Sequence, residues 1–404
     1  MLLFYNCFIR IYRILIFIAA FFNEKAKLWQ DGRKNSNITK LDQSIWFHFA
    51  SLGEFEQGRP VLEKMRELKP SQPIVITFFS PSGYEVRKNT PLADYVYYLP
   101  LDTNRNASKF IEAINPTVAI FTKYEYWYHY FNQLNQRQIP LYMISAIFRP
   151  NQAFFKWYGL LYRKMLTFVT RLFVQDEQSS QLLQNVGISN VTISGDTRFD
   201  RVWANAQAPK QLPIIEQFKS NSRVFIGGST WPEDEQLIAR IVPLYPDWKF
   251  IIAPHEITED KIAKLLSLLP ADQTIRLSQV KDISNPISDF RVLIIDNIGM
   301  LSSLYQYGEV AFIGGGFGAG IHNTLEAAAF GLPVIIGPKY QKFREARDII
   351  SMQLGFSINN FEELKPIVHK LITDNAYRIE TGKNIKAYVE KNTGATDTII
   401  KAIA

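Results

Sequence analysis

The sequence predicts an α/β protein with two doubly wound domains that face a cleft. A chain of 404 residues is too long for a single domain with one hydrophobic core. Its composition, 47% hydrophobic and 21% charged, is typical of a folded protein. Short apolar runs alternate with amphipathic helical stretches in both halves, which indicates parallel sheets. A polar stretch with two prolines, residues 204–222, separates the halves and predicts a linker. Ligands of such domains bind at the carboxyl ends of the strands.

The predicted order is an N-terminal helix over residues 1–23, two Rossmann-like domains over 24–205 and 206–384, and a helix over 385–404. The last helix is expected to pack back on the first domain. Apolar runs of strand length predict strands at 45–50, 74–79, 95–99, 117–121, 141–144, 171–175 and 191–194, then at 223–228, 250–253, 292–296, 310–313 and 334–336.

Residues 2–22 predict a helix that lies in a membrane interface. Arg10 and Arg13 share one helical stripe with Asn6, and the uncharged run from residue 14 to 22 is too short to span a bilayer. A buried core helix is one alternative, but two arginines disfavour it. A signal peptide is the other, but no small-residue cleavage pattern follows. Basic residues come next and favour a cytoplasmic face on an anionic membrane surface: Lys25, Lys27, Arg33 and Lys34.

Two other stretches carry specific expectations. A helix is predicted over 56–69, with Val61, Leu62, Met65 and Leu68 on its buried face. Residues 154–168 are apolar, aromatic and basic together. Core packing is the expected role of this stretch, and a lipid-facing surface is the alternative.

The strongest local signal is the stretch from Glu309 to Pro338. An apolar strand breaks into six glycines, four of them between 314 and 318, and Asn323 then opens a run of helix formers. A glycine turn before a helix N-terminus suits a bound anion, and Glu326 on its rim could accept hydrogen bonds from sugar hydroxyls. A tight turn with Asn323 as the helix cap explains the pattern equally well. The spacing is that of neither a dinucleotide fingerprint nor a P-loop.

Polar residues follow several strands of the first half. Ser51, Gly53 and Glu54 follow the first strand, where the glycine predicts a tight turn and Glu54 is a candidate general base or a capping acid. Glu125 is a second candidate carboxylate, although its aromatic neighbours suit a core. Hydroxyls and free N–H groups are expected after the second strand, at Ser80, Ser82 and Gly83.

In the second half, Pro254 and His255 follow one strand, and Ile298, Gly299 and Met300 come soon after another. A lone histidine is more often structural than a ligand. Together with the glycine turn, these strand ends fit a nucleotide held by this domain while the other domain holds an acceptor.

Composition excludes several classes of protein. One cysteine, Cys7, permits no disulfide within the chain, and five scattered histidines give no metal-site spacing, so no metal or cofactor is expected. The net charge of +7 indicates an acidic partner. Because the basic residues are dispersed and no nucleic-acid motif is present, a membrane is favoured over nucleic acid.

With these residues in view, the chain resembles the 3-deoxy-D-manno-octulosonic acid (Kdo) transferases of lipid A biosynthesis. The likeness follows the family's order of motifs over almost the whole length: Gly32-Arg33-Lys34, Ser51–Glu54, Pro81-Ser82-Gly83, Tyr124–Trp127, Gly195–Asp200, Gly228–Thr230, Asp296–Leu301 and Gly318–Glu326. Each motif is weak by itself, and the ordered set is strong.

The resemblance implies a GT-B fold and inverting transfer of Kdo from CMP-Kdo to the lipid A precursor, lipid IVA, at the inner membrane without metal. It implies that Glu54 is the catalytic base and that the second domain binds CMP. The CMP-binding residues would be Pro254, His255, Ile298, Gly299, Met300, Asn323, Thr324, Leu325, Glu326 and Arg198, with Ser51, Gly53, Ser80, Ser82 and Gly83 on the acceptor side.

Three positions depart from the family pattern. This chain has Pro254-His255-Glu256 where the family has Pro-Arg-His, and Arg198 where the family has a lysine. It also has Gly320-Ile321-His322 where the family has Gly-Gly-His. Two other hypotheses remain. Another GT-B transferase with a different nucleotide sugar would prefer a uracil nucleotide, and a non-catalytic nucleotide-binding module would show no turnover.

Overall fold

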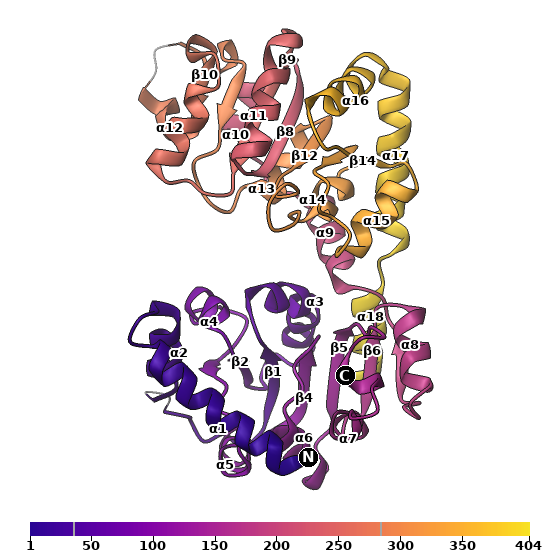
Figure 1. The fold of residues 1–404 in the computed structure, drawn as a ribbon. Coiled ribbons are helices and arrows are strands. Elements are labelled where there is room, and N and C mark those ends of the chain that lie inside the picture. The colour runs from indigo at the N-terminus through magenta and orange to yellow at the C-terminus, as the bar shows by residue number, and fades with distance from the viewer. Residues whose placement is uncertain (35–36, 283–284) are drawn as a thin grey trace. The chain divides into compact units, whose positions relative to one another are not determined.

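A computed structural model describes residues 1–34, 37–282 and 285–404 (Figure 1). The chain forms two compact units, one of Met1–Asp200 with Asn392–Ala404 and one of Arg201–Lys391. Each unit contains a sheet of seven strands, and all the strand pairs are parallel. The predicted α/β class with two doubly wound domains is therefore confirmed. The predicted domain boundaries lie between residues 205 and 206 and between 384 and 385. In the structure, the boundaries between the units lie between 200 and 201 and between 391 and 392.

The sheet of the first unit has the strand order β3-β2-β1-β4-β5-β6-β7. Every strand predicted in this half is present: β1 (Ser44–Phe49), β2 (Ile74–Phe78), β3 (Tyr95–Tyr98), β4 (Pro116–Thr122), β5 (Leu141–Ala146), β6 (Arg171–Val174) and β7 (Val191–Ile193). Both β1 and β2 are buried along their full length, since helices cover both faces of a parallel sheet. This burial explains why the sequences of β1 and β2 are nearly continuous apolar runs.

The helices of the first unit connect successive strands, except for the two that precede β1 and the one at the C-terminus. They are α1 (Leu2–Ala19), α2 (Glu24–Lys34), α3 (Leu52–Leu68), α4 (Pro81–Arg87), α5 (Asn104–Ile114), α6 (Tyr128–Gln136), α7 (Leu160–Thr167), α8 (Glu177–Gln184) and α18 (Ala395–Ile403). Helix α3 begins four residues before the predicted start, so Gly53 and Glu54 are helical. Leu68 is 46% exposed, so its predicted place on the buried face is wrong, and Phe55 is buried instead.

Helix α1 contacts the rest of the first unit through Ile9, the Tyr12 ring and polar groups, and turns most of its apolar side chains outward. The Tyr5 hydroxyl donates to Asp102 (2.5 Å), and Nε2 of His129 lies 2.7 Å from Oδ1 of Asn6. Ile9 is the one buried residue of the helix, so the core-helix alternative is wrong. Helix α1 is long enough, and its mean hydropathy high enough, to cross a membrane. Large apolar residues are exposed along it: Leu3, Phe4, Phe8, Ile11, Ile14, Leu15, Phe17 and Ile18.

Residues 154–168 divide between the two expected roles. Phe154, Met165 and Leu166 are buried in the core beside α6, as core packing predicts. Trp157 is 90% exposed, however, and Leu160 is also exposed. Core packing is thus correct for part of the stretch only.

The sheet of the second unit has the order β10-β11-β9-β8-β12-β13-β14. Its strands are β8 (Arg223–Thr230), β9 (Trp248–Pro254), β10 (Thr274–Arg276), β11 (Val292–Ile294), β12 (Val310–Ile313), β13 (Val334–Ile336) and β14 (Gly355–Ser357). The five predicted strands are confirmed. The edge strands β10 and β14 were not predicted.

Helix α9 (Thr197–Gln207) leads into the second unit, whose helices are α10 (Pro213–Lys219), α11 (Pro232–Ile241), α12 (Glu259–Ser267), α13 (Leu301–Leu304), α14 (Thr324–Ala329), α15 (Arg344–Ser351), α16 (Phe361–Thr373) and α17 (Asn375–Lys391). Because α10 buries Ile215 and Phe218, the linker interpretation is wrong over 213–219. The C-terminal helix is interrupted at Gly394, which has a φ of +102°.

Helix α18 completes the first unit. Ile399 and Ile400 join the core cluster of Phe47, Phe49 and Leu62. One carboxylate holds its start, because Asp200 accepts hydrogen bonds from the N–H groups of Gly394 (2.5 Å) and Thr396 (2.7 Å). The last residues of the chain therefore belong to the same domain as the first.

Candidate active site

The strand order places two candidate carboxylates at the centre of the first sheet. Strands β1 and β4 are neighbours, and the order reverses between them because β2 and β5 lie on opposite sides. Ligands of doubly wound sheets bind at this switch point, beyond the carboxyl ends of the strands. Glu54 follows β1 and Glu125 follows β4. The backbone thus brings the two acids to one edge of the sheet.

Glu54 lies in the first turn of α3 with a half-buried side chain. Its Oε2 accepts a hydrogen bond from the Ala50 N–H at 2.5 Å, so the carboxylate does cap the helix start. Burial and the charge of Glu125 nevertheless raise the pKa of Glu54 to about 7, against the lowering effects of Ala50, Lys123 and Ser51. Gly53 lies within helix α3, so the tight-turn prediction is wrong, and an added Cβ there would meet Ser51 Oγ only at 3.9 Å.

A hydrogen-bonded chain from the sheet core fixes Glu125. Thr77 Oγ1 lies 2.8 Å from Nδ1 of His48, and Nε2 of His48 lies 3.0 Å from Oε2 of Glu125. Because Trp46 Nε1 donates to Thr77 (2.8 Å), the hydroxyl proton is best placed toward His48 Nδ1. His48 then carries its proton on Nε2 and donates it to the carboxylate. Trp127 Nε1 donates to the same oxygen at 2.8 Å.

The turn after β2 is a helix cap and supplies fewer free groups than predicted. Ser80 Oγ accepts the Ser82 N–H (3.2 Å), and the Gly83 N–H donates to the Ser80 carbonyl oxygen (3.3 Å). These N–H groups are therefore used within α4, and the expectation that they are free is wrong. A Cβ at Gly83 would lie 2.3 Å from the Phe78 ring, so this glycine permits close packing.

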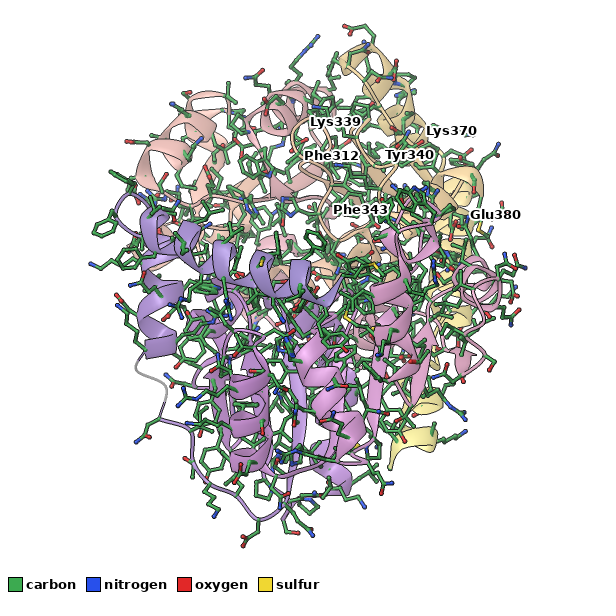
Figure 2. All side chains as sticks on the ribbon, turned by 60° about the horizontal axis from the view of Figure 1, so that its bottom comes forward. Phe312, Lys339, Tyr340, Phe343, Lys370 and Glu380 are labelled. Atoms are coloured by element: carbon green, nitrogen blue, oxygen red, sulfur yellow. The ribbon has the colours of Figure 1, made fainter. Side chains whose placement is uncertain are left out.

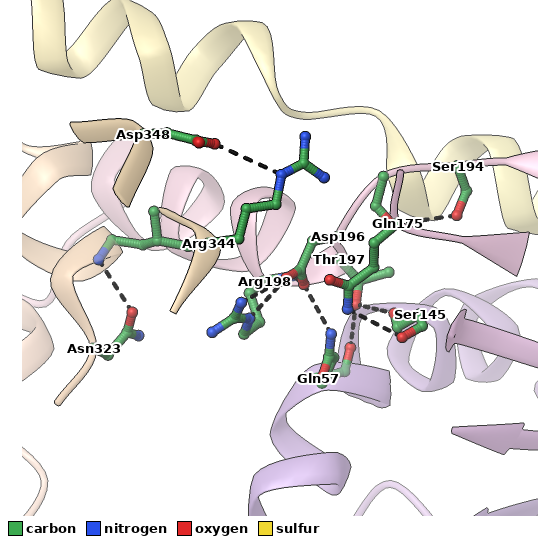
Figure 3. Close-up of polar contacts among 12 residues, drawn as sticks. Gln57, Ser145, Gln175, Ser194, Asp196, Thr197, Arg198, Asn323, Arg344 and Asp348 are labelled. Carbon is green, nitrogen blue, oxygen red and sulfur yellow. Dashed lines mark hydrogen bonds and ion pairs between the residues drawn. The ribbon is translucent and has the colours of Figure 1, made fainter. Parts of the chain in front are cut away.

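Arg198 lies in the first unit, at the start of α9 (Figure 3). Its guanidinium donates to Asp196 Oδ2 through Nε (2.9 Å) and a terminal nitrogen (2.7 Å). Gln57 from α3 donates to the other oxygen of Asp196 at 2.9 Å, and Arg198 keeps the pKa of this buried acid below its usual value. Arg198 is therefore held beside the helix that carries Glu54.

In the second unit, the glycine turn follows β12, whose neighbour across the switch point is β8. Gly315 has a φ of +91°, and a Cβ on Gly316 would lie 2.6 Å from the Gly337 backbone, so both positions require glycine. The turn is stabilised from within the domain. The N–H of Gly315 donates to Asp234 Oδ2 (2.9 Å), and those of Gly314, Gly318 and Gly320 donate to backbone carbonyls. These four N–H groups are therefore not donors for an anion.

The segment after β13 also supports the turn. Lys339, labelled with Phe343 in Figure 2, donates through its backbone N–H to Gly316 (2.9 Å) and through Nζ to the Phe317 carbonyl oxygen (2.8 Å). The Phe343 ring lies 3.1 Å from the position of a Cβ on Gly320. The turn thus has a fixed shape before any ligand binds.

Three aromatic rings form a small platform beside this turn. The ring planes of Trp231 and His322 are nearly parallel (9°), and Trp231 Nε1 donates to His322 Nε2 at 3.0 Å. That bond places the proton of a neutral His322 on Nδ1. Burial lowers the pKa of His322 to about 4, with a smaller contribution from His255. His255 packs against both rings, with centroids 4.8 Å from Trp231 and 4.4 Å from His322.

The remaining predicted residues lie around the same edge. Asn323 accepts the Leu325 N–H (3.1 Å), which confirms its role as a helix cap, and its amide donates to Glu326 at 3.0 Å. The hydroxyl of the buried Thr324 has no hydrogen-bond partner in the described part of the chain. Pro254 ends β9 and Met300 precedes α13, while Ile298 is 89% exposed.

Sequence reasoning did not single out His48, Thr77, Asp234 or Trp231. A lone histidine in the apolar run of β1 was the available signal for His48. Among residues 1–34, 37–282 and 285–404, no group of three or more His, Cys, Asp or Glu side chains is placed to hold a metal ion.

The sequence of the chain is similar to those of known proteins. Residues 22–201 match the family described as 3-deoxy-D-manno-octulosonic-acid transferase (kdotransferase). The 3-deoxy-D-manno-octulosonic acid transferases of Rickettsia felis and Haemophilus influenzae are each 26% identical to the chain. Each alignment covers 89% of the chain, and 78% and 86% of those proteins respectively. The Aquifex aeolicus enzyme is also 26% identical, over 82% of the chain and 86% of its own length.

Solved structures share the fold. UDP-GlcNAc 2-epimerase from Neisseria meningitidis superposes with a TM-score of 0.63 at 16% identity, covering 89% of this chain and 99% of the epimerase. A glycosyltransferase from Rickettsia africae superposes with a TM-score of 0.58 at 13% identity, covering 89% and 97%. These structures show a GT-B type architecture.

Two Rossmann-like domains with polar strand ends and this set of relatives define a glycosyltransferase of the GT-B fold. Among such enzymes, the chain is similar to the Kdo transferases, because residues 22–201 match their family and relatives of that name align with most of the chain.

Proposed function

We propose that the protein transfers Kdo from CMP-Kdo to the lipid A precursor, lipid IVA, with inversion, and that Glu54 is the general base. The pKa of Glu54 supports this role: it is raised to about 7 at the sheet's switch point. A base whose pKa is near the working pH is ionised often enough to act and still accepts a proton readily.

In the proposed step, Glu54 removes the proton of an acceptor sugar hydroxyl while that oxygen attacks the anomeric carbon of Kdo. The bond from this carbon to the CMP phosphate breaks, its electron pair leaves with the phosphate, and attack from the opposite face inverts the configuration. Glu125 helps because its negative charge makes Glu54 more basic. His48 and Trp127 hold Glu125 in place for this purpose.

We assign CMP to the second domain and the acceptor to the first. Glu326 would bind the ribose hydroxyls, and the neutral His322, with its proton on Nδ1, would donate to the phosphate. The other proposed donor contacts are Pro254, His255, Ile298, Gly299, Met300, Asn323, Thr324, Leu325 and Arg198. Ser51, Gly53, Ser80, Ser82 and Gly83 would border the acceptor. No metal takes part in this proposal.

We further propose that α1 anchors the enzyme on the cytoplasmic face of the inner membrane. The outward apolar side chains of α1 and the net charge of +7 support an anionic membrane surface as the partner.

The test is Kdo transfer from CMP-Kdo to lipid IVA with EDTA present, with the products read by mass. Glu54→Gln is expected to lower kcat about 10²–10⁴-fold. Glu63→Gln, on the same helix and paired with Arg59, should match wild type. If folded wild type transfers no Kdo and binds UDP in preference to CMP, a different donor is the answer. Equal transfer by Glu54→Gln and wild type would remove Glu54 from its role.

A further inference from the structure

An amphiphilic cavity lies between helices α1 and α2 of the first unit. Its volume is about 450 Å³, within the range of about 300–1,000 Å³ for small-molecule sites. Ile16 and Phe17 of α1, together with Leu101 after β3, provide apolar walls. A second cavity, of about 350 Å³, shares Phe17 and Gln30 and continues along the same two helices.

Three cationic residues line the first cavity: Arg13, Arg33 and Lys34. Arg33 is the most unusual of them because its half-buried guanidinium donates to backbone carbonyl oxygens. Its N–H groups donate to the carbonyl oxygens of Trp29, Phe79 and Leu99, and its guanidinium carbon lies 3.7 Å from the centre of the Trp29 ring. In the described part of the chain no carboxylate pairs with Arg33, and burial lowers its pKa to about 9. An anionic ligand would compensate this charge.

The cavity wall also holds polar atoms without partners. Trp29 is 6% exposed, and its Nε1 has no hydrogen-bond partner among the described residues. The same is true of Oε1 of Gln30, and both residues line the cavity. Buried polar atoms are usually paired, so a ligand oxygen that accepts the Trp29 N–H and a ligand hydroxyl that donates to the Gln30 oxygen would each satisfy one of these atoms.

An aromatic path connects this cavity to the candidate active site. The Phe79 ring lies 5.9 Å from Trp29 and stacks on Trp127 at 4.9 Å. Trp127 in turn donates its N–H to Glu125. Among the described residues, this path runs from the cavity wall to that carboxylate through two side chains, Phe79 and Trp127.

We propose that the cavity holds one acyl chain of the acceptor lipid, with a phosphate of the same molecule against Arg13, Arg33 and Lys34. The chain would lie along Ile16, Phe17 and Leu101, and the path through Phe79 and Trp127 places its sugar near Glu125. This assignment rests on the proposed function, since it takes the acceptor to be an acylated, phosphorylated sugar.

The first test measures binding without catalysis. Dodecyl phosphate, below its micelle concentration, should bind the full chain with 1:1 stoichiometry in calorimetry. Ile16→Trp fills the cavity and should weaken binding at least tenfold, and Arg13→Gln should weaken it severalfold. Ile18→Trp and Arg10→Gln make the same changes on exposed residues of α1 outside the cavity lining, and should bind like wild type. Absence of binding by wild type, or equal losses in test and control variants, would overturn the site.

The second test identifies the occupant. In detergent free of phospholipid, Ile16→Trp should raise KM for the acylated acceptor at least tenfold with little change in kcat. It should leave KM unchanged for a fully deacylated acceptor, which has lost both its ester-linked and its amide-linked chains. If the variant binds dodecyl phosphate weakly but keeps a wild-type KM, a bilayer phospholipid is the occupant and the acceptor assignment fails. If wild type binds dodecyl phosphate but transfers no Kdo, the proposed function fails and an acyl-phosphate site remains.

Discussion

Glu54 illustrates how one side chain can stabilise a helix start and still be reactive. Its hydrogen bond from the Ala50 N–H favours the ionised form, but burial and the charge of Glu125 outweigh that bond. The folded pKa of about 7 lies above the usual value of 4.5. The stability that this group contributes is therefore fully present below pH 4.5 and is lost as pH rises through about 7.

Glu54→Gln should consequently stabilise the protein at pH 8 and not at pH 4.5. Because one pKa unit corresponds to about 1.4 kcal/mol, we expect a gain of about 1–3 kcal/mol at pH 8, measured by urea unfolding at both pH values. In wild type, kcat/KM should rise with pH up to about 7, as Glu54 becomes ionised. A pH-independent difference in stability between the two proteins would show that Glu54 has an ordinary pKa.

Glu125→Gln should move the acid limb of the pH–rate profile to lower pH. Removing this negative charge removes the second largest cause of the raised pKa of Glu54, while burial, the largest cause, remains. We therefore expect a shift of less than about one pKa unit, together with a fall in kcat. Glu112→Gln, at an exposed position of α5, is the matched control. An acid limb that moves to higher pH would contradict the assigned coupling.

At this scale, the sequence was sufficient to predict which acids follow the central strands. Glu54 and Glu125 were found because a strand end followed by a polar turn is visible in one dimension. The hydrogen-bonded series from Thr77 through His48 to Glu125 was not predicted. Its members come from three different strand regions, and their alignment depends on the order of strands in the sheet.

At the scale of elements, the glycine turn combines two different requirements. Gly315 needs a left-handed backbone, whereas Gly316 needs the absence of a side chain against Gly337. Gly318 has neither constraint, since a Cβ there would meet only the Gly315 carbonyl oxygen at 3.7 Å. The three glycines look alike in the sequence and differ in the structure.

Gly316→Ala should therefore destabilise the protein by about 1–3 kcal/mol, a typical cost of overpacking. Gly318→Ala adds the same methyl group in open space and should change stability by less than about 1 kcal/mol. Urea unfolding monitored by circular dichroism compares the two variants. Equal destabilisation would mean that the backbone contact between Gly316 and Gly337 does not restrict this position.

The elements that sequence reasoning missed are short or lie at boundaries. Strands β10 and β14 have three residues each at opposite edges of the second sheet, so neither gives a continuous apolar run. Helix α10 begins with a proline in a polar stretch, and only its buried pair, Ile215 and Phe218, distinguishes it from a linker. Central strands were predictable because helices cover both of their faces.

At the scale of the whole molecule, the two exposed apolar surfaces of the first unit can be compared directly. Phe8 of α1 is 63% exposed and Trp157 is 90% exposed. If α1 is the membrane anchor, Phe8→Asp should weaken binding to anionic vesicles about tenfold or more, and Trp157→Asp should have a smaller effect. Flotation with vesicles measures both. The reverse ranking would assign the membrane contact to residues 154–168.

The return of the C-terminus to the first unit has a consequence for biosynthesis. Residues Arg201–Lys391 are synthesised after the first sheet and before α18, which takes about 10–40 s at about 5–20 residues per second. During that interval, the surface of Phe47, Phe49 and Leu62 that will receive Ile399 and Ile400 is exposed to water on the ribosome. The nascent chain therefore carries an open hydrophobic surface until its last nine helical residues emerge.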